Sequence, residues 1–412
     1  MSQSFTTADT DEVIQERAQQ RNLQRIDVVV KIAERCNLAC TYCYFFSDEG
    51  HGYKIHPSRM SSETWSSVVM FLRDGVKECG AGLLRVVFHG GEPTLVGAAN
   101  FDRMCQEIRD HLDGVVSLDL AIQTNGTLVS PAWVRVLKKH AVAVGVSMDG
   151  PAEYNDIARV DHKGNGSHSA TVKGVALLMD AAKKAGGPKP GALFVVNPEY
   201  DPQRIYDHLV KELGFDAIDA LLPDQPSVDD AASYGHFLAG LFDAWVTGGD
   251  PSIYIRTFRA FLDRLAGFGS YQFPMDPSSD DFMSLSISSD GSLKPDDIVL
   301  DTRWSDAHCA TTSLRQFSLH PLYQDWMDAA AAVPAECSDC CWVNICRGGH
   351  PWHRYQTGNG YHGRSRYCEG LKVLYSHVSA FMLKSGYPLP LLLNQLGLGS
   401  ETFDGSTLHA KH

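Results

Sequence analysis

The segment Asp27-Val-Val-Val-Lys-Ile-Ala33, followed by Cys36-Asn-Leu-Ala-Cys40-Thr-Tyr-Cys43, decides the fold. The first seven residues are rich in β-branched side chains and predict a buried strand. Three cysteines at C-x3-C-x2-C spacing follow directly after that strand. Proteins built from parallel strands and helices carry their active sites at the ends of strands. The cysteines therefore mark a candidate active site at the end of the first strand.

Five further β-branched runs follow, and each precedes a helical stretch. Two of the helices have clear start signals, Ser130 with Pro131 and Asp201 with Pro202. Six βα units in series predict a parallel sheet, either open or closed into a barrel. The predicted later strands are Leu84–Phe88, Val115–Gln123, Ala143–Met148, Ala192–Val196 and Ala217–Leu222.

Four regions are expected from the change of pattern along the chain. Residues 1–25 form a polar extension and residues 26–246 the α/β domain. Residues 247–385 are rich in loops and cysteine, and include a hairpin signal at Ser289-Asp290-Gly291. Residues 386–412 form a C-terminal tail.

Composition excludes several function classes. The 412 residues carry a formal charge of −13, from 36 basic and 49 acidic side chains. An acidic chain without a basic tract is poorly suited to nucleic acid, which requires neutralisation of phosphates. No apolar stretch is long enough to span a membrane, and the first 25 residues lack the apolar core of a signal peptide. We therefore expect a cytoplasmic protein that binds neither nucleic acid nor membranes.

Eleven cysteines are many for a cytoplasmic protein, and nine of them fall in two clusters. Because a reducing compartment disfavours disulfides, clustered cysteines there indicate metal binding or catalysis. Cys79 and Cys105 stand alone on predicted helices, and we interpret them as buried core thiols.

The first cluster has the spacing of an iron–sulfur site. Three thiolates from Cys36, Cys40 and Cys43 can hold three irons of a 4Fe-4S cluster and leave the fourth iron open to an outside molecule. A three-cysteine zinc site, or a structural cluster with a distant fourth ligand, is the alternative from spacing alone. Zinc knuckles usually show paired C-x2-C and a nearby histidine, whereas His51 and His56 lie in a polar loop.

This pattern resembles the radical S-adenosylmethionine (SAM) superfamily, in which C-x3-C-x-aromatic-C follows the first strand of a partial (β/α)6 TIM-like barrel. Tyr42 stands at the aromatic position. The resemblance implies an α/β fold of that kind, a SAM-binding 4Fe-4S cluster, and SAM as cofactor.

Further motifs arrive in the order of that superfamily, each after a strand. Gly90-Gly91-Glu92-Pro93 resembles the turn that holds the SAM amino group, with glycines for close backbone approach and Glu92 as an ammonium partner. Arg159 resembles the arginine that pairs with the SAM carboxylate. A turn residue at Asp149 and a surface charge at Arg159 are the alternatives. The other residues that the resemblance assigns to SAM binding are Gln123, Thr124, Asn125, Ser147 and Asp149.

The second cluster resembles the SPASM extension, a C-terminal iron–sulfur domain of many radical SAM peptide modifiers. Cys337, Cys340, Cys346 and Cys368 match the ligands of one auxiliary 4Fe-4S cluster. A structural zinc on these four residues is the alternative.

The other auxiliary cluster of the SPASM pattern is expected to be missing. Asp296 and His350 stand where two of its cysteines would be, and no cysteine precedes the hairpin within the domain. Cys309 and Cys341 are left over, and we expect both to be unligated.

The resemblance also implies a substrate class and a reaction. Reductive cleavage of SAM would give a 5′-deoxyadenosyl radical that removes hydrogen from a ribosomal precursor peptide, with electrons from a donor such as flavodoxin or ferredoxin. His353-Arg354-Tyr355, Asn359-Gly360-Tyr361 and the final Cys368 resemble the cyclophane-forming maturases, which join an aromatic ring to a nearby β-carbon. Asp297 would be the catalytic base, or else a turn residue after the hairpin.

Two other functions stay open. An anaerobic sulfatase-maturating enzyme would oxidise Cys or Ser to formylglycine, but the missing ligands of one auxiliary cluster argue against it. An iron–sulfur electron carrier, the non-enzyme alternative, needs neither the SAM motifs nor six βα units.

Overall fold

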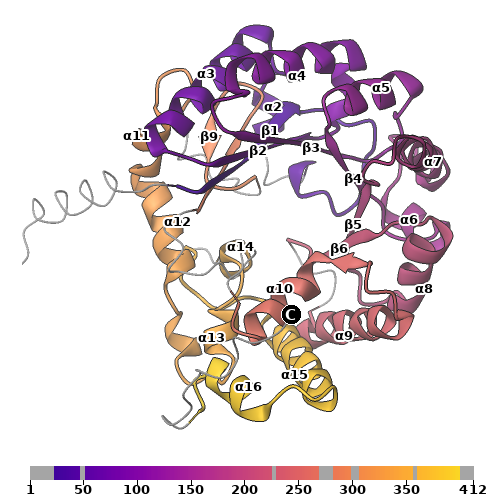
Figure 1. Cartoon of the computed structure of the whole chain (residues 1–412), viewed down its shortest axis with the longest axis vertical. Coiled ribbons are helices and arrows are strands. Elements are labelled where there is room, and N and C mark those ends of the chain that lie inside the picture. Colours follow the sequence, from indigo (N-terminus) through magenta and orange to yellow (C-terminus); the bar gives the residue numbers. More distant parts are fainter. Residues whose placement is uncertain are drawn as a thin grey trace, which may run out of the picture. The chain divides into compact units, whose positions relative to one another are not determined.

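The computed structural model describes residues 23–46, 52–224, 229–268, 282–297, 306–355 and 360–399 (Figure 1). Most of the expected N-terminal extension, the end of the tail, and Asn359 lie outside these ranges. No helix within them is both long and apolar enough to cross a membrane.

All six predicted strands are present, with ends within two residues of the prediction. Alternating burial along the first strand, where Ile26, Val28 and Val30 are fully buried, shows that one face packs against helices. The six strands are β1 (Arg25–Ala33), β2 (Leu83–Gly90), β3 (Ser117–Thr124), β4 (Ala143–Ser147), β5 (Gly191–Val195) and β6 (Ala217–Leu221).

The sheet is α/β in type and mainly parallel. Its nine strands follow the order β7-β6-β5-β4-β3-β2-β1-β8-β9. β1 pairs in parallel with β2, and this register sets Lys31 opposite His89. Crossover helices between successive strands account for the parallel arrangement. The three remaining strands are β7 (Tyr254–Ile255), β8 (Phe282–Ile287) and β9 (Leu293–Lys294).

A row of aromatic rings fills the core between the sheet and its covering helices. Trp65 of α3, Phe88 of β2, Phe101 of α4 and Trp133 of α5 follow one another with ring centroids 5.6, 4.7 and 5.1 Å apart. Such large rings provide much of the apolar area that stabilises a core. The helices along this part of the chain are α2 (Gly52–Ile55), α3 (Ser62–Cys79), α4 (Ala98–Leu112), α5 (Pro131–Lys139), α6 (Ala152–Ala158), α7 (His168–Ala185) and α8 (Pro202–Tyr206).

The two expected helix starts at prolines are present. Ser130 caps α5 by accepting a hydrogen bond from the Trp133 N–H, and Pro131 occupies the first turn. Asp201 Oδ1 accepts from the Gln203 N–H at 2.9 Å, directly before α8. Each cap satisfies a backbone donor that the first helical turn leaves without a partner.

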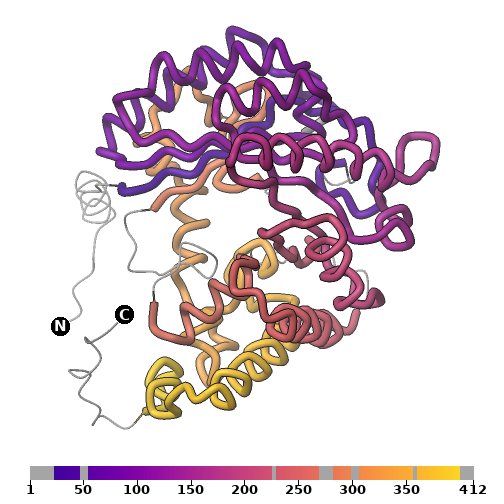
Figure 2. Tube along the Cα trace, turned by 45° about the vertical axis from the view of Figure 1, so that its right-hand side comes forward, coloured from indigo at the N-terminus to yellow at the C-terminus, as the bar shows by residue number. Residues whose placement is uncertain are grey.

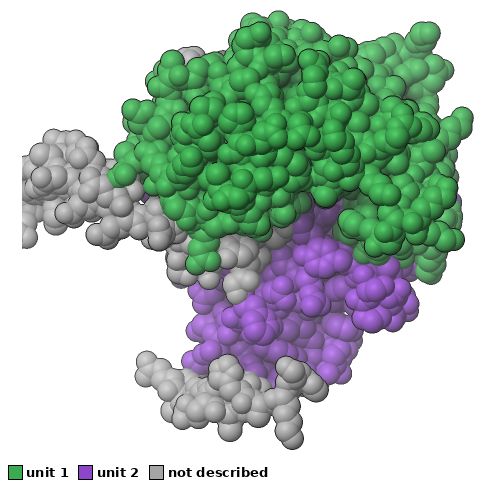
Figure 3. All heavy atoms as spheres, turned by 45° about the horizontal axis from the view of Figure 1, so that its top comes forward, with its two compact units in different colours: residues 1–194, 207–218, 278–327 green, residues 195–206, 219–277, 328–412 purple. Residues whose placement is uncertain are grey.

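The chain forms two compact units (Figure 3), and their limits differ from those expected from the sequence. Unit 1 contains residues 1–194, 207–218 and 278–327, and unit 2 contains residues 195–206, 219–277 and 328–412. The hairpin was expected in the cysteine-rich domain. In the structure it belongs to unit 1 because β8 pairs with β1 in parallel.

That hairpin joins β8 to β9 with antiparallel pairing of Ser286 with Lys294 and of Ile287 with Leu293. Gly291 turns the chain with φ +97°, and its N–H donates to the Ser288 carbonyl at 2.9 Å. The predicted turn at Ser289-Asp290-Gly291 is therefore present. It carries Asp296 and Asp297 to the end of β8, the strand that pairs with β1.

Unit 2 is built around the pair α9 and α15, which run side by side (Figure 2). Their contact depends on Gly235 and Gly370, since an added Cβ on either would lie 2.2–2.3 Å from backbone oxygen of the other helix. Helices later in the chain are α9 (Ala231–Gly248), α10 (Arg256–Leu265), α11 (Leu314–Ser318), α12 (Pro321–Ala331), α13 (Val343–Cys346), α14 (Pro351–Arg354), α15 (Cys368–Lys384) and α16 (Leu389–Gln395).

Candidate functional site

The loop that carries the first three cysteines starts where β1 ends and is held by the segment after α6. The Ala39 N–H donates to the Val160 carbonyl at 2.8 Å and the Thr41 N–H to the Ala158 carbonyl at 3.0 Å. The Leu38 N–H lies 3.3 Å from Cys36 Sγ as a donor. The two bonds to the carbonyls of Val160 and Ala158 fix the loop without using the thiols, whereas the Leu38 bond uses the Cys36 sulfur.

The three thiols are partly buried and affect one another's charge. Burial is the main cause that raises the pKa of Cys36 to about 12 and that of Cys40 to about 11, and the neighbouring thiols add to both shifts. Soft metal ions overcome such a shift because they bind the thiolate. The donor set therefore fits a thiolate-held cluster.

No three His, Cys, Asp or Glu side chains of the described ranges converge as a site for a single metal ion. A 4Fe-4S cluster does not require this, because each thiolate binds a different iron.

Within the protein, the Gly90-Gly91-Glu92 turn packs closely against the start of the cysteine loop. An added Cβ would lie 2.0 Å from the Ala33 carbonyl oxygen at Gly90, which has φ +131°, and 2.6 Å from the Arg35 oxygen at Gly91. The Gly91 N–H donates to that same Ala33 oxygen at 2.8 Å. The glycines let the turn pack against the root of the cysteine loop.

Glu92 lies beneath this turn, only 1% exposed, and its carboxylate is occupied from inside the protein. Oε1 accepts from the Thr94 N–H at 2.9 Å and from Thr124 Oγ1 at 2.7 Å, and Oε2 accepts from the Asn125 N–H at 2.8 Å. Burial raises the pKa of Glu92, and these donors oppose the rise. The carboxylate thus ties the end of β2 to the end of β3.

The end of β3 connects this turn to the cysteines. Asn125 Nδ2 donates to Asn37 Oδ1 at 3.0 Å and lies 3.8 Å from Cys36 Sγ. Gln123 Nε2 donates to Ser147 Oγ at 2.9 Å, which links β3 to β4. The residues expected after strands 2, 3 and 4 are therefore brought together in unit 1.

Tyr42, Asp149 and Arg159 form one hydrogen-bonded group, in which Asp149 and Arg159 are buried and Tyr42 is exposed. The Tyr42 hydroxyl donates to Asp149 Oδ2, and Arg159 Nη2 donates to Asp149 Oδ1 at 3.1 Å. Arg159 Nε lies 3.0 Å from Asp149 Oδ2 as an ion pair, although its N–H is not aligned for a hydrogen bond. With exposed fractions of 8% and 3%, Arg159 is not a surface charge and Asp149 is not an exposed turn residue.

Asp297 lies next to groups that keep it charged. Its Oδ2 accepts from the Tyr44 hydroxyl at 2.7 Å, and its backbone carbonyl accepts from Lys31 Nζ at 2.6 Å. Burial alone would raise the pKa of Asp297, but His89, Lys31 and these hydrogen bonds outweigh it and hold the pKa at about 2. The side chain is therefore an ionised carboxylate at any ordinary pH.

Two residues of this group, Lys31 and Tyr44, were missed in the sequence. Lys31, 3% exposed, is the buried charged residue of β1, and His89 lies in β2 directly before Gly90. Burial lowers the pKa of both side chains. His89 Nδ1 is buried without a well-aligned hydrogen-bond partner. The signal in the sequence was Lys31 itself, because a charged side chain is rare at a strand position that faces the core.

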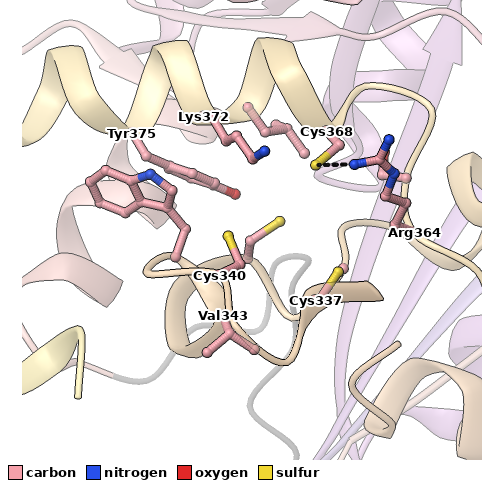
Figure 4. A pocket seen from close by; sticks show the side chains of 12 residues that line it. Cys337, Cys340, Val343, Arg364, Cys368, Lys372 and Tyr375 are labelled. Atoms are coloured by element: carbon pink, nitrogen blue, oxygen red, sulfur yellow. Dashed lines mark hydrogen bonds between the residues drawn. The ribbon is translucent and has the colours of Figure 1, made fainter. Parts of the chain in front are cut away.

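The second cysteine set lines one pocket of unit 2, with about 330 Å³ of empty space. The sulfurs of Cys337, Cys340 and Cys368 point into the same space (Figure 4). Cys346 also lines it, and burial raises the pKa of its thiol to about 11. Four convergent thiols are the donor set of a 4Fe-4S cluster, so the residues present fit that group.

The segment His353-Arg354-Tyr355 builds the frame behind this pocket. Arg354 is 1% exposed and donates to the carbonyls of Gly349, Ala329 and Arg347. Tyr355 stacks on Trp352, with ring centroids 5.5 Å apart. The packing interpretation, which the sequence left open for this segment, accounts for these contacts.

His350, at the position of a missing cluster cysteine, caps α14 through Nδ1, which accepts from the Trp352 N–H at 3.3 Å. Cys341 is exposed and does not line the pocket, while Cys309 is buried beside Gly291 in unit 1. Cys105 is fully buried, as expected, and Cys79 is half-buried.

Comparison with known proteins supports the family expectation. Residues 30–205 match the model of the radical SAM superfamily. A cysteine-type anaerobic sulfatase-maturating enzyme of Clostridium perfringens is 24% identical over 83% of this chain and 93% of its own length. A serine-type anaerobic sulfatase-maturating enzyme of Klebsiella aerogenes is 27% identical over 85% of this chain and 84% of its own.

Two solved structures have a similar fold. Native anSMEcpe with bound AdoMet and Kp18Cys peptide has a TM-score of 0.74 at 23% identity, covering 88% of this chain and 99% of that one. Streptococcus suis SuiB bound to precursor peptide SuiA has a TM-score of 0.60 at 14% identity, covering 89% of this chain and 82% of that one. The match over residues 30–205 and the cysteine loop at the end of β1 agree with the expectation of a radical SAM domain.

Proposed function

We propose that this protein is a radical SAM enzyme that removes two hydrogens from a side chain of a peptide substrate. The observation that carries the proposal is Asp297, an ionised carboxylate held by Tyr44 and Lys31 in the unit that also contains the cysteine loop. The sulfatase-maturating relatives and the two peptide-bound structures support a peptide as the substrate class.

Cys36, Cys40 and Cys43 would hold the 4Fe-4S cluster, and with SAM bound it would supply a 5′-deoxyadenosyl radical. Asn125 would restrain the loop at Cys36, and the Gly90-Gly91 turn would form its wall. The residues that we assign to the SAM pocket are Tyr42, Gln123, Thr124, Ser147, Asp149 and Arg159. Glu92 is the buried residue that positions this pocket.

Arg159 is already paired with Asp149, so its charge is partly compensated before a ligand arrives. A guanidinium has five donors, and Asp149 takes only part of them. The remaining N–H groups suit a bidentate contact with the carboxylate of SAM. Asp149 would thus orient Arg159, and Tyr42 would orient Asp149.

Asp297 would act as the general base. After the substrate carbon has lost a hydrogen atom, Asp297 Oδ1 would take one proton, and the group that Cys337, Cys340, Cys346 and Cys368 would hold could take up the remaining electron. The substrate would thus lose two hydrogens: a serine side chain gives formylglycine directly, whereas a cysteine side chain gives a thioaldehyde, which water would hydrolyse to formylglycine with release of sulfide. Tyr44, on Oδ2, would keep the carboxylate oriented while Oδ1 takes the proton.

The comparisons favour formylglycine as the product, since curated relatives that align over more than 80% of this chain are sulfatase-maturating enzymes. This was the alternative in the sequence interpretation, and the comparisons give the cyclophane reaction no direct support. An electron donor such as flavodoxin or ferredoxin would be the redox partner.

Cyclophane formation is the second candidate, because of one specific observation. Asp296 and His350 occupy two ligand positions of the other auxiliary cluster, and His350 serves as a helix cap. A chain that has lost this cluster differs from the SPASM pattern of the sulfatase-maturating type. The two products are chemically distinct, so one assay separates them.

The test uses two probes with anaerobically reconstituted enzyme, SAM and dithionite. The Kp18Cys peptide tests formylglycine, and a synthetic peptide with repeated aromatic-x-x triplets tests the cyclophane. Formylglycine reacts with a hydrazine, whereas a cyclophane does not and resists proteolysis between the joined residues. An unmodified outcome with both peptides, despite 5′-deoxyadenosine formation, would count against a peptide substrate of either type.

A further inference from the structure

Two histidines of unit 1 that no step of the proposed reaction uses face each other through the same ring atom. His168 is the first residue of α7, and His208 lies in the π-helical turn Asp207–Glu212. Their Nε2 atoms are 3.0 Å apart, and the ring planes are tilted by 36°. His208 is 5% exposed and His168 is half-buried. The pair therefore lies at the edge of the core rather than inside it.

The π-helical turn places a carboxylate behind the His208 ring. The Leu213 N–H donates to the His208 carbonyl, five residues back, at 3.0 Å, a wider turn than that of an α-helix. His208 Nδ1 lies 2.6 Å from Glu212 Oε2. Because a carboxylate only accepts hydrogen bonds, Nδ1 carries the proton of the neutral ring. Nε2 of His208 then directs its lone pair toward His168.

A neutral imidazole backed by a carboxylate is the arrangement of a metal-ligating histidine. Such a histidine almost always donates its other ring N–H to a carboxylate, a carbonyl or water, and His208 already donates to Glu212. His168 can direct a lone pair to the same point by carrying its proton on Nδ1, so no proton has to leave the protein. Asp156 adds negative charge nearby, since its Oδ1 accepts from the His168 backbone N–H at 2.8 Å.

The spacing of the two nitrogens suits an ion after a small movement. Zn–N bonds are about 2.0–2.1 Å long, which sets two nitrogens of a tetrahedral site about 3.3–3.4 Å apart. The separation of the two Nε2 atoms is 3.0 Å, so a small rotation of the half-buried His168 ring would admit the ion. No third His, Cys, Asp or Glu of the described residues completes a site here, so water would fill the other positions.

We propose that His168 and His208 bind one divalent transition-metal ion through their Nε2 atoms, with Glu212 as the residue that orients His208. Imidazole ligands suit Zn²⁺, Cu²⁺ and Ni²⁺, whereas Mg²⁺ and Ca²⁺ prefer oxygen. A bound ion would join the start of α7 to the π-helical turn. The site uses none of the cysteines, so the inference does not depend on the proposed function.

The experiment measures Zn²⁺ binding to the full chain after anaerobic cluster reconstitution and removal of excess metal. Competition with a chromophoric zinc chelator gives the number of sites and their affinity. His168→Gln removes one ligand, and Glu212→Gln removes the charge behind His208 while keeping an acceptor for its Nδ1–H. His111→Gln is the matched control: His111 is also half-buried on a helix of unit 1, but its Nδ1 bonds to the Glu107 carbonyl of its own helix.

We expect His168→Gln to bind one Zn²⁺ fewer than the wild type, and His111→Gln to bind as many as the wild type. Glu212→Gln should keep the site but weaken its affinity about 10–100-fold, the usual effect of losing the partner behind a ligating histidine. Equal zinc binding in His168→Gln and His111→Gln would overturn the inference and leave the two rings as a hydrogen-bonded pair.

If His168→Gln does not fold, Glu212→Gln decides, because its change lies on a partly exposed side chain. An affinity lowered by about 10–100-fold supports the inference, and an affinity equal to that of the wild type overturns it.

Discussion

Asp297→Asn removes the proposed base while leaving its surroundings almost intact. Lys31 donates to the backbone carbonyl of residue 297, so that bond survives the substitution. The Tyr44 hydroxyl can donate to the amide oxygen of Asn as it does to Oδ2 of Asp. The variant thus changes the charge and basicity of one side chain and keeps the end of the hairpin in place.

We expect a large loss of product formation but little loss of SAM cleavage. A general base contributes about 10²–10⁴ in rate, and we expect product formation to fall by that factor. At about 1.36 kcal/mol per tenfold, this raises the barrier by about 3–5 kcal/mol. Formation of 5′-deoxyadenosine should stay close to the wild-type rate, because the base acts after the hydrogen atom has been removed. The variant would therefore consume SAM without making product.

The pH dependence adds a second readout. Because the pKa of Asp297 is held at about 2, its carboxylate keeps its charge down to that pH and is lost as a base only below it. Wild-type product formation should show no acid limb from this residue between pH 5 and 9, a window above the ordinary Asp pKa of about 3.9. The ratio of wild-type to variant rates should be constant across that range.

The assay measures 5′-deoxyadenosine and modified peptide side by side, with the Kp18Cys peptide as substrate. Tyr44→Phe is the control: it removes one donor from Oδ2 but leaves the charge, so product formation should fall by less than tenfold. Product at the wild-type rate in Asp297→Asn would refute the base assignment. Loss of SAM cleavage in the same variant would place the defect before the base acts and refute it as well.

Three further predictions concern the clusters and the glycine turn. Changing the three cysteines of the loop after β1 to Ala should abolish 5′-deoxyadenosine formation but keep about four irons per chain, as measured by iron analysis; continued SAM cleavage would show that another site binds SAM. Wild-type protein should bind about eight irons, in two 4Fe-4S clusters by Mössbauer spectroscopy, and a value near twelve would mean that a third ligand set exists. Gly90→Ala should lower the melting temperature strongly, because its Cβ would meet the Ala33 oxygen at 2.0 Å. Gly97→Ala is the control and should lower it less, since Gly97 also has a positive φ but an added Cβ there would meet nothing within 4 Å. Similar losses in the two variants would show that φ alone sets the cost.

Much of the α/β architecture follows from local patterns in the sequence. The β-branched runs locate six strands to within two residues, and Ser130-Pro131 gives a helix start, because these signals depend on neighbours in the chain. The pairing of β8 with β1 was not predicted, since parallel partners more than 250 residues apart leave no local trace. The hairpin turn was predicted, but its place in the main sheet beside β1 was not.

In the candidate site, too, local signals were readable in the sequence and long-range contacts were not. Cysteine spacing and the order of the motifs indicated which residues come together, but not which atoms they use. The motif named Glu92 as an ammonium partner, but it did not reveal that the carboxylate accepts from Thr94, Thr124 and Asn125. Such networks depend on side-chain burial, which a motif does not encode.

Some residues near the sites had a readable signal that was overlooked. Lys31 interrupts an apolar strand, and Tyr375, which lines the cysteine pocket of unit 2, lies two helical turns after Cys368. In contrast, Arg354 had the appearance of a functional marker but donates to three backbone carbonyls in the frame behind the pocket. Only contacts separate a buried arginine that stabilises a loop from one that binds a ligand.

The central claim is that a SAM-derived radical takes hydrogen from a peptide side chain, and deuterium transfer tests it most directly. The Kp18Cys and aromatic-x-x peptides would be made with deuterium at the β-carbons and incubated with enzyme, SAM and dithionite. The account predicts that 5′-deoxyadenosine gains deuterium in step with product from at least one peptide, and that Asp297→Asn still shows the transfer. Modified peptide accompanied by 5′-deoxyadenosine free of deuterium would contradict it.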